Sequence, residues 1–369
     1  MKKAIVIYPV LENLEKNLIE NKLIETCNLA EAIYLDVIHK EYFILKKPDP
    51  KALMRKGKVN YFLEVFNEFK FIGNNNILIF AIDITPIQQR NLERIYKIKI
   101  LDKTSLILEI FGERAFSKIG RIQVELAHLN WQKSRLVRSW THLERQRGGF
   151  GFLGGPGESQ IELDKRMINK RIKQLKLLIL KAKKTREIQY NNRQKKRVPV
   201  VSLLGYTNAG KSTLFNSLTK LNVSAKNKLF ETLDTKISYF YLPLTKKAYI
   251  NDTVGFISDL PTLLVEAFKS TLDEVIKADL LIHVRDISIS NHEEQKSDVL
   301  NILKQLDIIP NAIDGPPMIE VINKVDVSNV ESKRFFKNKK DTFLISAKTG
   351  EGIESLKNEI DKILYSLSV

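Results

Sequence analysis

The chain of 369 residues is 43% hydrophobic, which is enough to build two or three domains with cores of their own. Its single cysteine, Cys27, excludes an intramolecular disulfide and favours a reducing, cytoplasmic location. The first apolar run is too short for a signal peptide, and no run approaches the roughly 20 residues of a membrane span, so we expect at most peripheral contact with a membrane. The formal net charge of +17 predicts a polyanionic partner such as RNA, although lysines at solvated positions account for part of it.

Residues 1–105 alternate short apolar runs with helical patterns, as in "KAIVIYPV" followed by "LEKNLIENKLIETCNLAEAI". This alternation predicts a small α/β subdomain in which helices cover a parallel sheet. We find no phosphate loop and no catalytic constellation in this part of the sequence.

Residues 106–197 have the pattern of a long helical hairpin. Apolar residues recur at helical spacing over 106–146 and again after Glu158, which places one apolar stripe on each helix. The glycine-rich tip between them, 145–160, is longer than a helix connection requires, although a plain long turn is the alternative. The tip carries cations and aromatic rings that are candidates for contact with single-stranded or looped RNA: Arg145, Arg147, Phe150 and Phe152.

The second helix of the hairpin continues into a strongly basic stretch, "KRMINKRIKQLKLLILKAKKTREIQYNNRQKKR", at residues 165–197. Isolated lysines often only keep a helix face solvated. Their concentration beside the tip favours a nucleic-acid-binding surface. The apolar run "VPVVSLLG" then opens a further domain, 198–369.

The sequence "GYTNAGKS" fits the phosphate-loop pattern G-x-x-x-x-G-K-[ST] and lies between an apolar strand and a helical run, as that motif requires. Backbone N–H groups of such a loop surround phosphates, its lysine neutralises the β and γ groups, and its hydroxyl ligates Mg²⁺. Asn208 can also help to hold K⁺ beside the phosphates, or simply brace the loop. The predicted phosphate-binding residues are Gly205, Tyr206, Thr207, Asn208, Ala209, Gly210, Lys211 and Ser212.

Three further segments follow in the order expected of a guanine nucleotide site. The first, "DTVG", supplies an acidic residue for Mg²⁺ and a glycine N–H for the γ-phosphate; the second, "NKVD", supplies a carboxylate for hydrogen bonds that guanine donates and adenine does not; the third, "SAK", offers an N–H to the guanine carbonyl. With the phosphate loop they predict a GTPase that binds GTP and GDP, whereas an RNA-dependent NTPase acting on ATP is an alternative. The residues are Asp252, Thr253, Val254, Gly255, Asn323, Lys324, Val325, Asp326, Ser346, Ala347 and Lys348.

The segments around the expected γ-phosphate leave two questions open. Within "LFETLDTKI" at 229–237, Thr232 and Thr235 both qualify as the hydroxyl that completes the Mg²⁺ shell. After "DTVG", Phe256 stands where many nucleotide switches carry a water-orienting Gln. Because an apolar ring cannot hydrogen-bond the attacking water, we expect slow hydrolysis by the free protein and assign no catalytic residue.

Several runs of the sequence resemble those of the HflX family, ribosome-associated GTPases of the Obg–HflX group. The runs are "RIQVELAHL", "RGGFGFLGGPGESQIELDKR", "GYTNAGKSTLFN", "FETLDT" and "DTVGFISDLP", in the family's order. The resemblance implies an α/β fold in which a P-loop GTPase domain is preceded by a small α/β domain and a long antiparallel helical hairpin. The tip departs from the family pattern at Leu153, Gly154 and Ser159.

The resemblance also implies site residues and partners. The family pattern Phe-Ala-Thr-Leu-Asp makes Thr232 the Mg²⁺ ligand alongside Ser212, and it places further nucleotide contacts at Phe230, Glu231, Leu233 and Asp234. It implies a monomeric protein that binds the large (50S) ribosomal subunit and its rRNA and splits or rescues stalled ribosomes under stress, with hydrolysis stimulated by the ribosome. The alternative is a GTP-controlled assembly or signalling switch that binds RNA off the ribosome.

Overall fold

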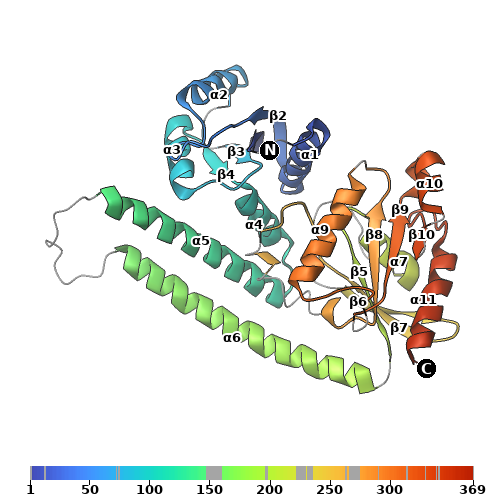
Figure 1. The fold of residues 1–369 in the computed structure, drawn as a ribbon. Coiled ribbons are helices and arrows are strands. Elements are labelled where there is room, and N and C mark those ends of the chain that lie inside the picture. The colour runs from blue at the N-terminus through green and yellow to red at the C-terminus, as the bar shows by residue number, and fades with distance from the viewer. Residues whose placement is uncertain are drawn as a thin grey trace. The chain divides into compact units, whose positions relative to one another are not determined.

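The computed structural model divides the chain into two compact units, Met1–Glu113 with Ile122–Leu178 and Arg114–Arg121 with Ile179–Val369. Figure 1 shows the elements of both units. The residues that the structure describes are 2–11, 14–71, 73, 75–146, 160–195, 198–221, 230, 236–261, 264–265, 275–289, 291–312, 315–328, 330–337, 339 and 341–368. Among these residues no helix is long and apolar enough to cross a membrane.

The first unit begins with a four-stranded parallel sheet in the order β2-β1-β3-β4, as the alternating sequence pattern predicts. Its strands are β1 (Lys2–Val10), β2 (Leu35–Ile44), β3 (Asn76–Phe80) and β4 (Lys99–Leu101). The connecting helices are α1 (Lys16–Ala32), α2 (Lys56–Glu68) and α3 (Pro86–Tyr96). Local residues determine where α3 starts, because Thr85 forms a capping box with Gln88 and Pro86 occupies the first turn.

The helical region starts with two helices where the sequence pattern predicted one long helix from residue 106 to 146. The structure has α4 (Lys103–Arg114) and then α5 (Lys118–Gln146). The helix is interrupted at Ser117, because the Ser117 Oγ accepts a hydrogen bond from the Gly120 N–H at 2.9 Å and so caps the start of a new helix, α5. Phe116, in the break, is 73% exposed and contributes nothing to the core.

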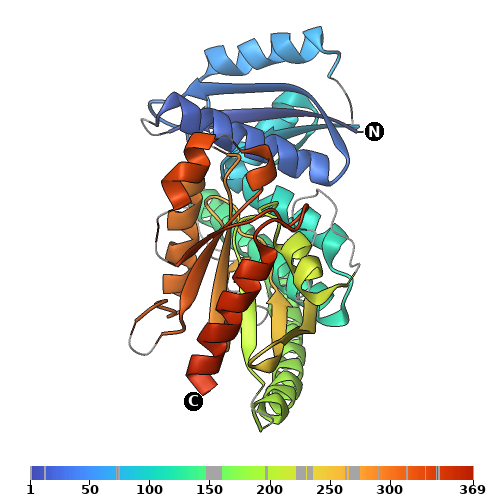
Figure 2. The ribbon, with the colours of Figure 1, turned by 90° about the vertical axis from the view of Figure 1, so that its right-hand side faces the viewer.

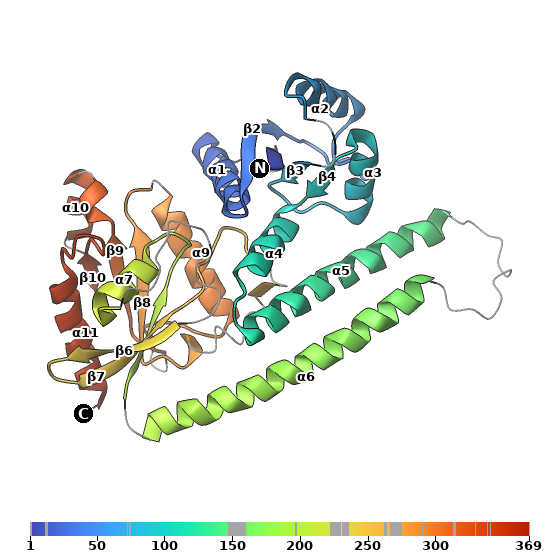
Figure 3. The same ribbon diagram turned by 180° about the vertical axis from the view of Figure 1, so that it is seen from behind.

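The helices α5 and α6 (Gln160–Lys195) run antiparallel as a hairpin (Figure 3). In the first unit they are joined by Leu126, Ile172 and Leu175, which are buried members of the two predicted stripes. Arg171 of α6 also donates to both carboxylate oxygens of Glu125 of α5, at 2.6 and 3.0 Å. The hairpin therefore rests on an apolar seam, with a charged pair at its surface.

The second unit contains a six-stranded sheet in the order β10-β9-β8-β5-β7-β6, in which only β6 is antiparallel to its neighbour. Its strands are β5 (Val200–Leu204), β6 (Lys236–Leu242), β7 (Lys246–Asp252), β8 (Leu280–Asp286), β9 (Met318–Asn323) and β10 (Thr342–Leu344). The helical elements described are α7 (Lys211–Thr219), α9 (His292–Gln305), the 3₁₀ turn η1 (Val325–Val327), α10 (Val330–Lys337) and α11 (Ile353–Ser368).

The core of the second unit lies against both faces of its central strands. All residues of β5 and β8 are buried, as strands in the middle of a parallel sheet covered on both faces usually are. One apolar cluster includes Leu214 of α7 and Leu356 of α11, and another includes Val299 of α9. In Figure 2 the red helix α11 runs along the sheet. The architecture confirms the predicted fold class, and the boundaries at 105/106 and 197/198 stay predictions.

Candidate nucleotide-binding site

The predicted nucleotide segments lie at the carboxyl ends of the parallel strands of the second unit. The phosphate loop follows β5, "DTVG" begins at the last residue of β7, and "NKVD" begins at the last residue of β9. The carboxyl ends of parallel strands meet at one edge of a sheet, which is where ligands bind in open α/β folds. The fold thus brings together segments that are more than 100 residues apart in the sequence.

The phosphate loop needs its two glycines. Gly205 has φ +144°, and a Cβ there would lie 2.2 Å from the carbonyl oxygen of Val284. Gly210 has φ +93°, and a Cβ there would lie 2.1 Å from Nδ2 of Asn323. Both positions combine a backbone conformation that side chains disfavour with a contact that leaves no room for one. Asn208, between them, has φ 62°, which asparagine tolerates.

Lys211 is buried at the start of α7, where its Nζ donates to the carbonyl oxygens of Gly205 at 3.0 Å and Tyr206 at 2.7 Å. Burial lowers the pKa of Lys211 to about 8, against the opposing effect of the Asp252 carboxylate. The ammonium is thus held by the loop's own carbonyls in a poorly hydrated place. A negatively charged phosphate at this place stabilises the charged form.

Ser212 and Asp252 provide a donor set that fits Mg²⁺. The Ser212 Oγ donates to Asp252 Oδ2 at 2.7 Å, and Asp252 is fully buried at the end of β7. A hydroxyl and a carboxylate are hard oxygen ligands of the kind that Mg²⁺ prefers beside phosphates. Among the described residues no three His, Cys, Asp or Glu side chains form a metal cluster, and a nucleotide-bound Mg²⁺ does not need one.

Gly255 and Phe256 are joined to the phosphate loop through the backbone. The Thr207 N–H donates to the Phe256 carbonyl at 2.8 Å, and the Phe256 N–H donates to the Gly205 carbonyl at 3.1 Å. A Cβ on Gly255 would lie 2.7 Å from Cγ2 of Thr207. Only glycine therefore allows this close approach of the two loops.

The ring of Phe256 points into the protein. Phe256 is 2% exposed and belongs to an apolar cluster with Tyr206, Val275, Leu281 and Val299. The sequence placed Phe256 where a water-orienting side chain is expected, and the structure gives its ring a packing role. What Phe256 offers toward the phosphate loop is its backbone.

Asn323 connects the phosphate loop with the "SAK" segment. Its Nδ2 donates to the Ala209 carbonyl at 2.9 Å, and its Oδ1 accepts from the Ala347 N–H at 2.9 Å. Asn323 therefore braces the two segments against each other with two hydrogen bonds. The Ala347 N–H, which we expected to meet the guanine carbonyl, is engaged with Asn323 in this structure, so a bound base must share or replace that bond.

The predicted base-binding carboxylate, Asp326, is exposed in the middle of the 3₁₀ turn η1. A hydrogen bond from the Ser346 side chain lowers the pKa of Asp326, and the charges of Lys348 and Lys324 act in the same direction. Ser346 is itself fully buried, and Val325 is anchored by its N–H to the Ile345 carbonyl at 3.2 Å. These contacts keep an ionised acceptor at the sheet edge.

Asp286, which the sequence motifs did not single out, holds the lysine of "NKVD". Its Oδ2 accepts from Lys324 Nζ at 2.6 Å, and its Oδ1 accepts from both the N–H and the hydroxyl of Ser288 at 2.9 and 2.6 Å. Asp286 is the last residue of β8, so an acidic residue at the carboxyl end of the mostly apolar run "LLIHVRD" was the available signal.

The remaining predicted site residues are described in part. Phe230 is buried with φ 53°, Thr253 donates its hydroxyl to the Leu203 carbonyl at 2.6 Å, and Val254 is 8% exposed. Arg145 lies in the last turn of α5, and its side chain is outside the described set. The predicted residues that lie outside the described part of the chain are Arg147, Phe150, Phe152, Glu231, Thr232, Leu233 and Asp234. Thr235, the alternative to Thr232, also lies outside it.

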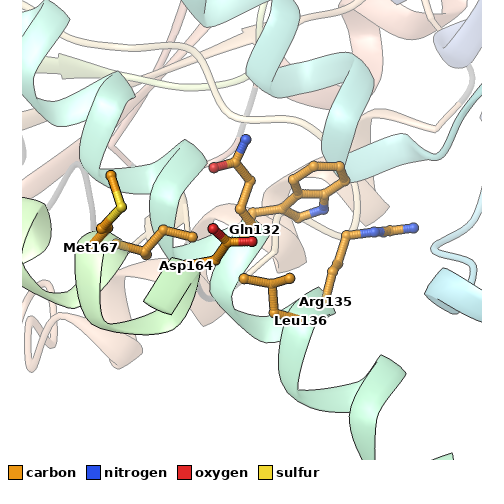
Figure 4. Close-up of a pocket in the computed structure, with 7 residues that line it drawn as sticks. Gln132, Arg135, Leu136, Asp164 and Met167 are labelled. Atoms are coloured by element: carbon orange, nitrogen blue, oxygen red, sulfur yellow. The ribbon is translucent and has the colours of Figure 1, made fainter. Parts of the chain in front are cut away.

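A separate hollow of about 480 Å³ lies in the first unit between α5 and α6. Figure 4 shows Leu136 and Arg135 of α5 and Asp164 of α6 lining it. Trp131 also lines the hollow. The Arg135 guanidinium lies 4.5 Å from the centre of its ring, so this tryptophan has a packing contact. None of the predicted nucleotide or RNA residues lines this hollow.

The arrangement in the second unit defines a class: a P-loop nucleotide-binding protein with the segment order of a GTPase. Known proteins support this class along the chain. Residues 20–112 match the family model of the GTP-binding GTPase N-terminal region, 114–193 match that of the middle region, and 200–324 match that of the 50S ribosome-binding GTPase.

Relatives and a solved structure extend the match to nearly the whole chain. The GTPase HflX of Magnetococcus marinus is 41% identical over 361 residues, which cover 97% of this chain and 81% of that protein. The GTPase HflX of Escherichia coli is 42% identical over 314 residues, covering 84% and 71% of the two chains. A crystal structure of SsGBP with GDP, 24% identical and covering both chains fully, has the same fold at a TM-score of 0.53. The chain therefore belongs to the HflX family of GTPases, and GTPases of this class use Mg²⁺.

Proposed function

We propose that this GTPase binds the large ribosomal subunit and its rRNA in its GTP form, separates stalled ribosomes under stress, and leaves after hydrolysis. It would act as a monomer in the cytoplasm, with slow hydrolysis alone and faster hydrolysis on the ribosome. The family-model match at residues 200–324 supports the ribosomal partner. The observation that carries the nucleotide part is the Asn323 brace, which joins the phosphate and base segments into one site.

The site residues of this proposal are those that the sequence motifs and the family resemblance indicate. Gly205–Ser212 would hold the phosphates, Ser212 and Thr232 would ligate Mg²⁺, and Asp326 would accept the guanine edge. Asn208 would be the residue next to K⁺ if a monovalent cation takes part, and equal hydrolysis rates in K⁺ and Na⁺ buffers would exclude that cation. The charges of α6 supply the electrostatic attraction to rRNA, since Lys165, Arg166, Lys170 and Lys173 line one hollow on its surface.

Co-sedimentation tests the partner. Purified protein is centrifuged with large subunits in the presence of a non-hydrolysable GTP analogue, GDP or ATP. We expect co-migration with the GTP analogue that is lost with GDP, and no support from ATP. Equal co-migration in all three conditions, or none, would contradict the proposal.

A second experiment tests the splitting. Light scattering of intact ribosomes is followed after addition of the protein with GTP. A fall in scattering that Asp326→Ala abolishes in GTP supports splitting driven by guanine nucleotide. Subunit binding without any fall in scattering would contradict the proposed splitting and support only the proposed binding. Crosslinks to RNAs other than large-subunit rRNA would favour a switch that acts off the ribosome.

A further inference from the structure

The hairpin of β6 and β7 at the edge of the second unit's sheet has two unlike faces. On its inner face Phe240, Leu242, Ala248 and Ile250 belong to the core cluster. On its outer face Ile237, Tyr239 and Tyr241 alternate with those core residues and are 41%, 46% and 65% exposed. Neighbouring side chains on one face of a strand are two residues apart, so these three form a row.

The second strand adds an aromatic ring and a cation to the same face. In the antiparallel register Tyr239 lies opposite Tyr249 and Tyr241 lies opposite Lys247. Directly opposed residues share a face of the sheet. The Lys247 Nζ lies 3.9 Å from the ring centre of Tyr239, and the rings of Tyr239 and Tyr241 meet edge to face with centres 5.7 Å apart. We call Tyr239, Tyr241, Lys247 and Tyr249 the tyrosine face.

The charged residues of the segment 236–251, which carries the tyrosine face, are all of one sign. From residue 236 to residue 251 the sequence has three lysines, Lys236, Lys246 and Lys247, and no acidic residue. The acid that approaches the hairpin from α11 is Asp361, which is 2% exposed and accepts hydrogen bonds from Leu244 N at 2.7 Å and Thr245 N at 2.8 Å. Its carboxylate is thus engaged in holding the turn of the hairpin.

We infer that the tyrosine face binds single-stranded RNA by stacking bases on Tyr241 and Tyr239, with the hairpin lysines contacting phosphates. Exposed aromatic rings in a row on a strand, together with lysines, are features that sheets use to hold unpaired bases. A base that stacks on Tyr239 displaces the Lys247 ammonium from that ring and leaves it for a phosphate. The absence of acids from residue 236 to residue 251 favours this anionic occupant over a protein surface of mixed charge, and the acid that ends β7, Asp252, is fully buried.

This inference adds a second RNA contact to the proposed function, and it stands without the hairpin tip or the ribosome. The probe is a fluorescent oligouridylate of about 12 nucleotides, titrated against the full chain with GDP present. An oligonucleotide of equal length without bases measures the part of the affinity that phosphates alone supply. We expect the oligouridylate to bind more tightly than the abasic chain.

Two variants and a matched control locate the binding. Tyr241→Ala should weaken oligouridylate binding about fivefold or more, and Tyr241→Phe should restore it, because stacking needs the ring and not the hydroxyl. Tyr365→Ala, which removes a tyrosine of 49% exposure from α11, should leave it unchanged. Unchanged affinity for GDP shows that each variant is folded.

Other outcomes would overturn the inference. Oligouridylate binding that Tyr241→Ala does not weaken, or that Tyr365→Ala weakens equally, would exclude the tyrosine face as an RNA site. If the oligonucleotide does not bind and a protein of the large subunit crosslinks to Tyr241, the face is a protein-docking surface and the inference is wrong. Failure of ribosome co-sedimentation with intact oligouridylate binding would instead contradict the proposed function alone.

Discussion

At the residue scale, the ion pair between Asp286 and Lys324 should contribute to nucleotide affinity. Asp286→Asn removes the charge partner of Lys324 while keeping an oxygen for Ser288, so the lysine stem is no longer fixed beside the base site. We expect GDP to bind about tenfold more weakly, about 1.4 kcal/mol. Titration of a fluorescent GDP measures the change, and Glu359→Gln, which removes the partner of Lys362 at 3.6 Å on α11, is the control. Equal affinities for both variants would show that the Asp286 pair is only structural.

The pKa of Lys211 gives the nucleotide site a predictable pH dependence. Burial lowers this pKa to about 8 in the free protein, and bound phosphates raise it. Binding should therefore take up a proton near pH 8 and weaken by up to about tenfold per pH unit above it, whereas this group causes no change below about pH 7. Calorimetry of GDP binding at pH 8 in buffers of different ionisation enthalpy measures the uptake. Heats that do not depend on the buffer would contradict the prediction.

Phe256 should matter more for stability than for hydrolysis. Phe256→Ala empties a buried ring position, for which we expect a loss of about 3 kcal/mol in the free energy of unfolding. The hydrogen bonds from this residue to the phosphate loop are made by its backbone and survive the change. Basal GTP hydrolysis by the folded variant should therefore stay within about tenfold, about 1.4 kcal/mol, in a ribosome-free assay. A much larger fall would mean that the ring shapes the hydrolytic site.

The sequence could predict single residues only where a local motif marks them. The phosphate loop, Asp252 and Asn323 could be singled out because their spacing and strand context are local. Asp286 was missed, because its partner Lys324 is brought to it by the pairing of β8 with β9. The direction of the Phe256 ring was equally out of reach, since it depends on helix α9 and on strand β8 packing over it.

At the element scale, Arg135 ties α5 to the loops of the first unit's sheet. It donates to Asp102 Oδ2 at 2.9 Å and to the Ile84 carbonyl at 3.3 Å, and Asp102 is 2% exposed. Burial raises the pKa of Asp102, against the opposing effects of Ser105 and Arg135. Removing Arg135 therefore leaves a buried carboxylate without its cation.

Arg135→Ala should lower the free energy of unfolding of the first unit by about 3 kcal/mol. Both tryptophans, Trp131 and Trp140, lie in α5, so their fluorescence in a urea titration reports this unit. The control is Arg171→Ala, which breaks the exposed bidentate pair with Glu125 and should cost much less than Arg135→Ala does. Similar losses in the two variants would refute the difference that burial predicts.

Sequence periodicity predicted which helices and strands form, but it did not predict where they begin and end. The parallel sheet of the first unit and the two long helices were predicted because strand and helix periods are local properties. The break between α4 and α5 was missed, because the apolar pattern continues through Phe116 while the Ser117 cap depends on a single hydroxyl. The antiparallel edge strand β6 was also not predicted, and it is the strand that carries the tyrosine face.

At the scale of the whole molecule, the distribution of the +17 charge should decide how the protein meets the ribosome. If the basic surface of α6 contacts rRNA, association with the large subunit should weaken tenfold or more between about 50 and 200 mM salt, because several counterions are released per complex. GDP affinity measured over the same range should change far less. Salt-independent association would indicate that apolar protein contacts dominate.

Charge reversal at two sites separates local contact from net charge. Lys170→Glu on α6 and Lys304→Glu on α9 change the net charge equally, and both lysines are exposed. Non-specific attraction depends on the total charge and predicts equal losses of association. Contact through α6 predicts that Lys170→Glu weakens co-sedimentation several-fold more than Lys304→Glu and also reduces the salt dependence, because fewer phosphates are neutralised. Equal losses would assign the attraction to the molecule's overall field, and a larger loss at Lys304 would place the contact surface on α9 of the second unit.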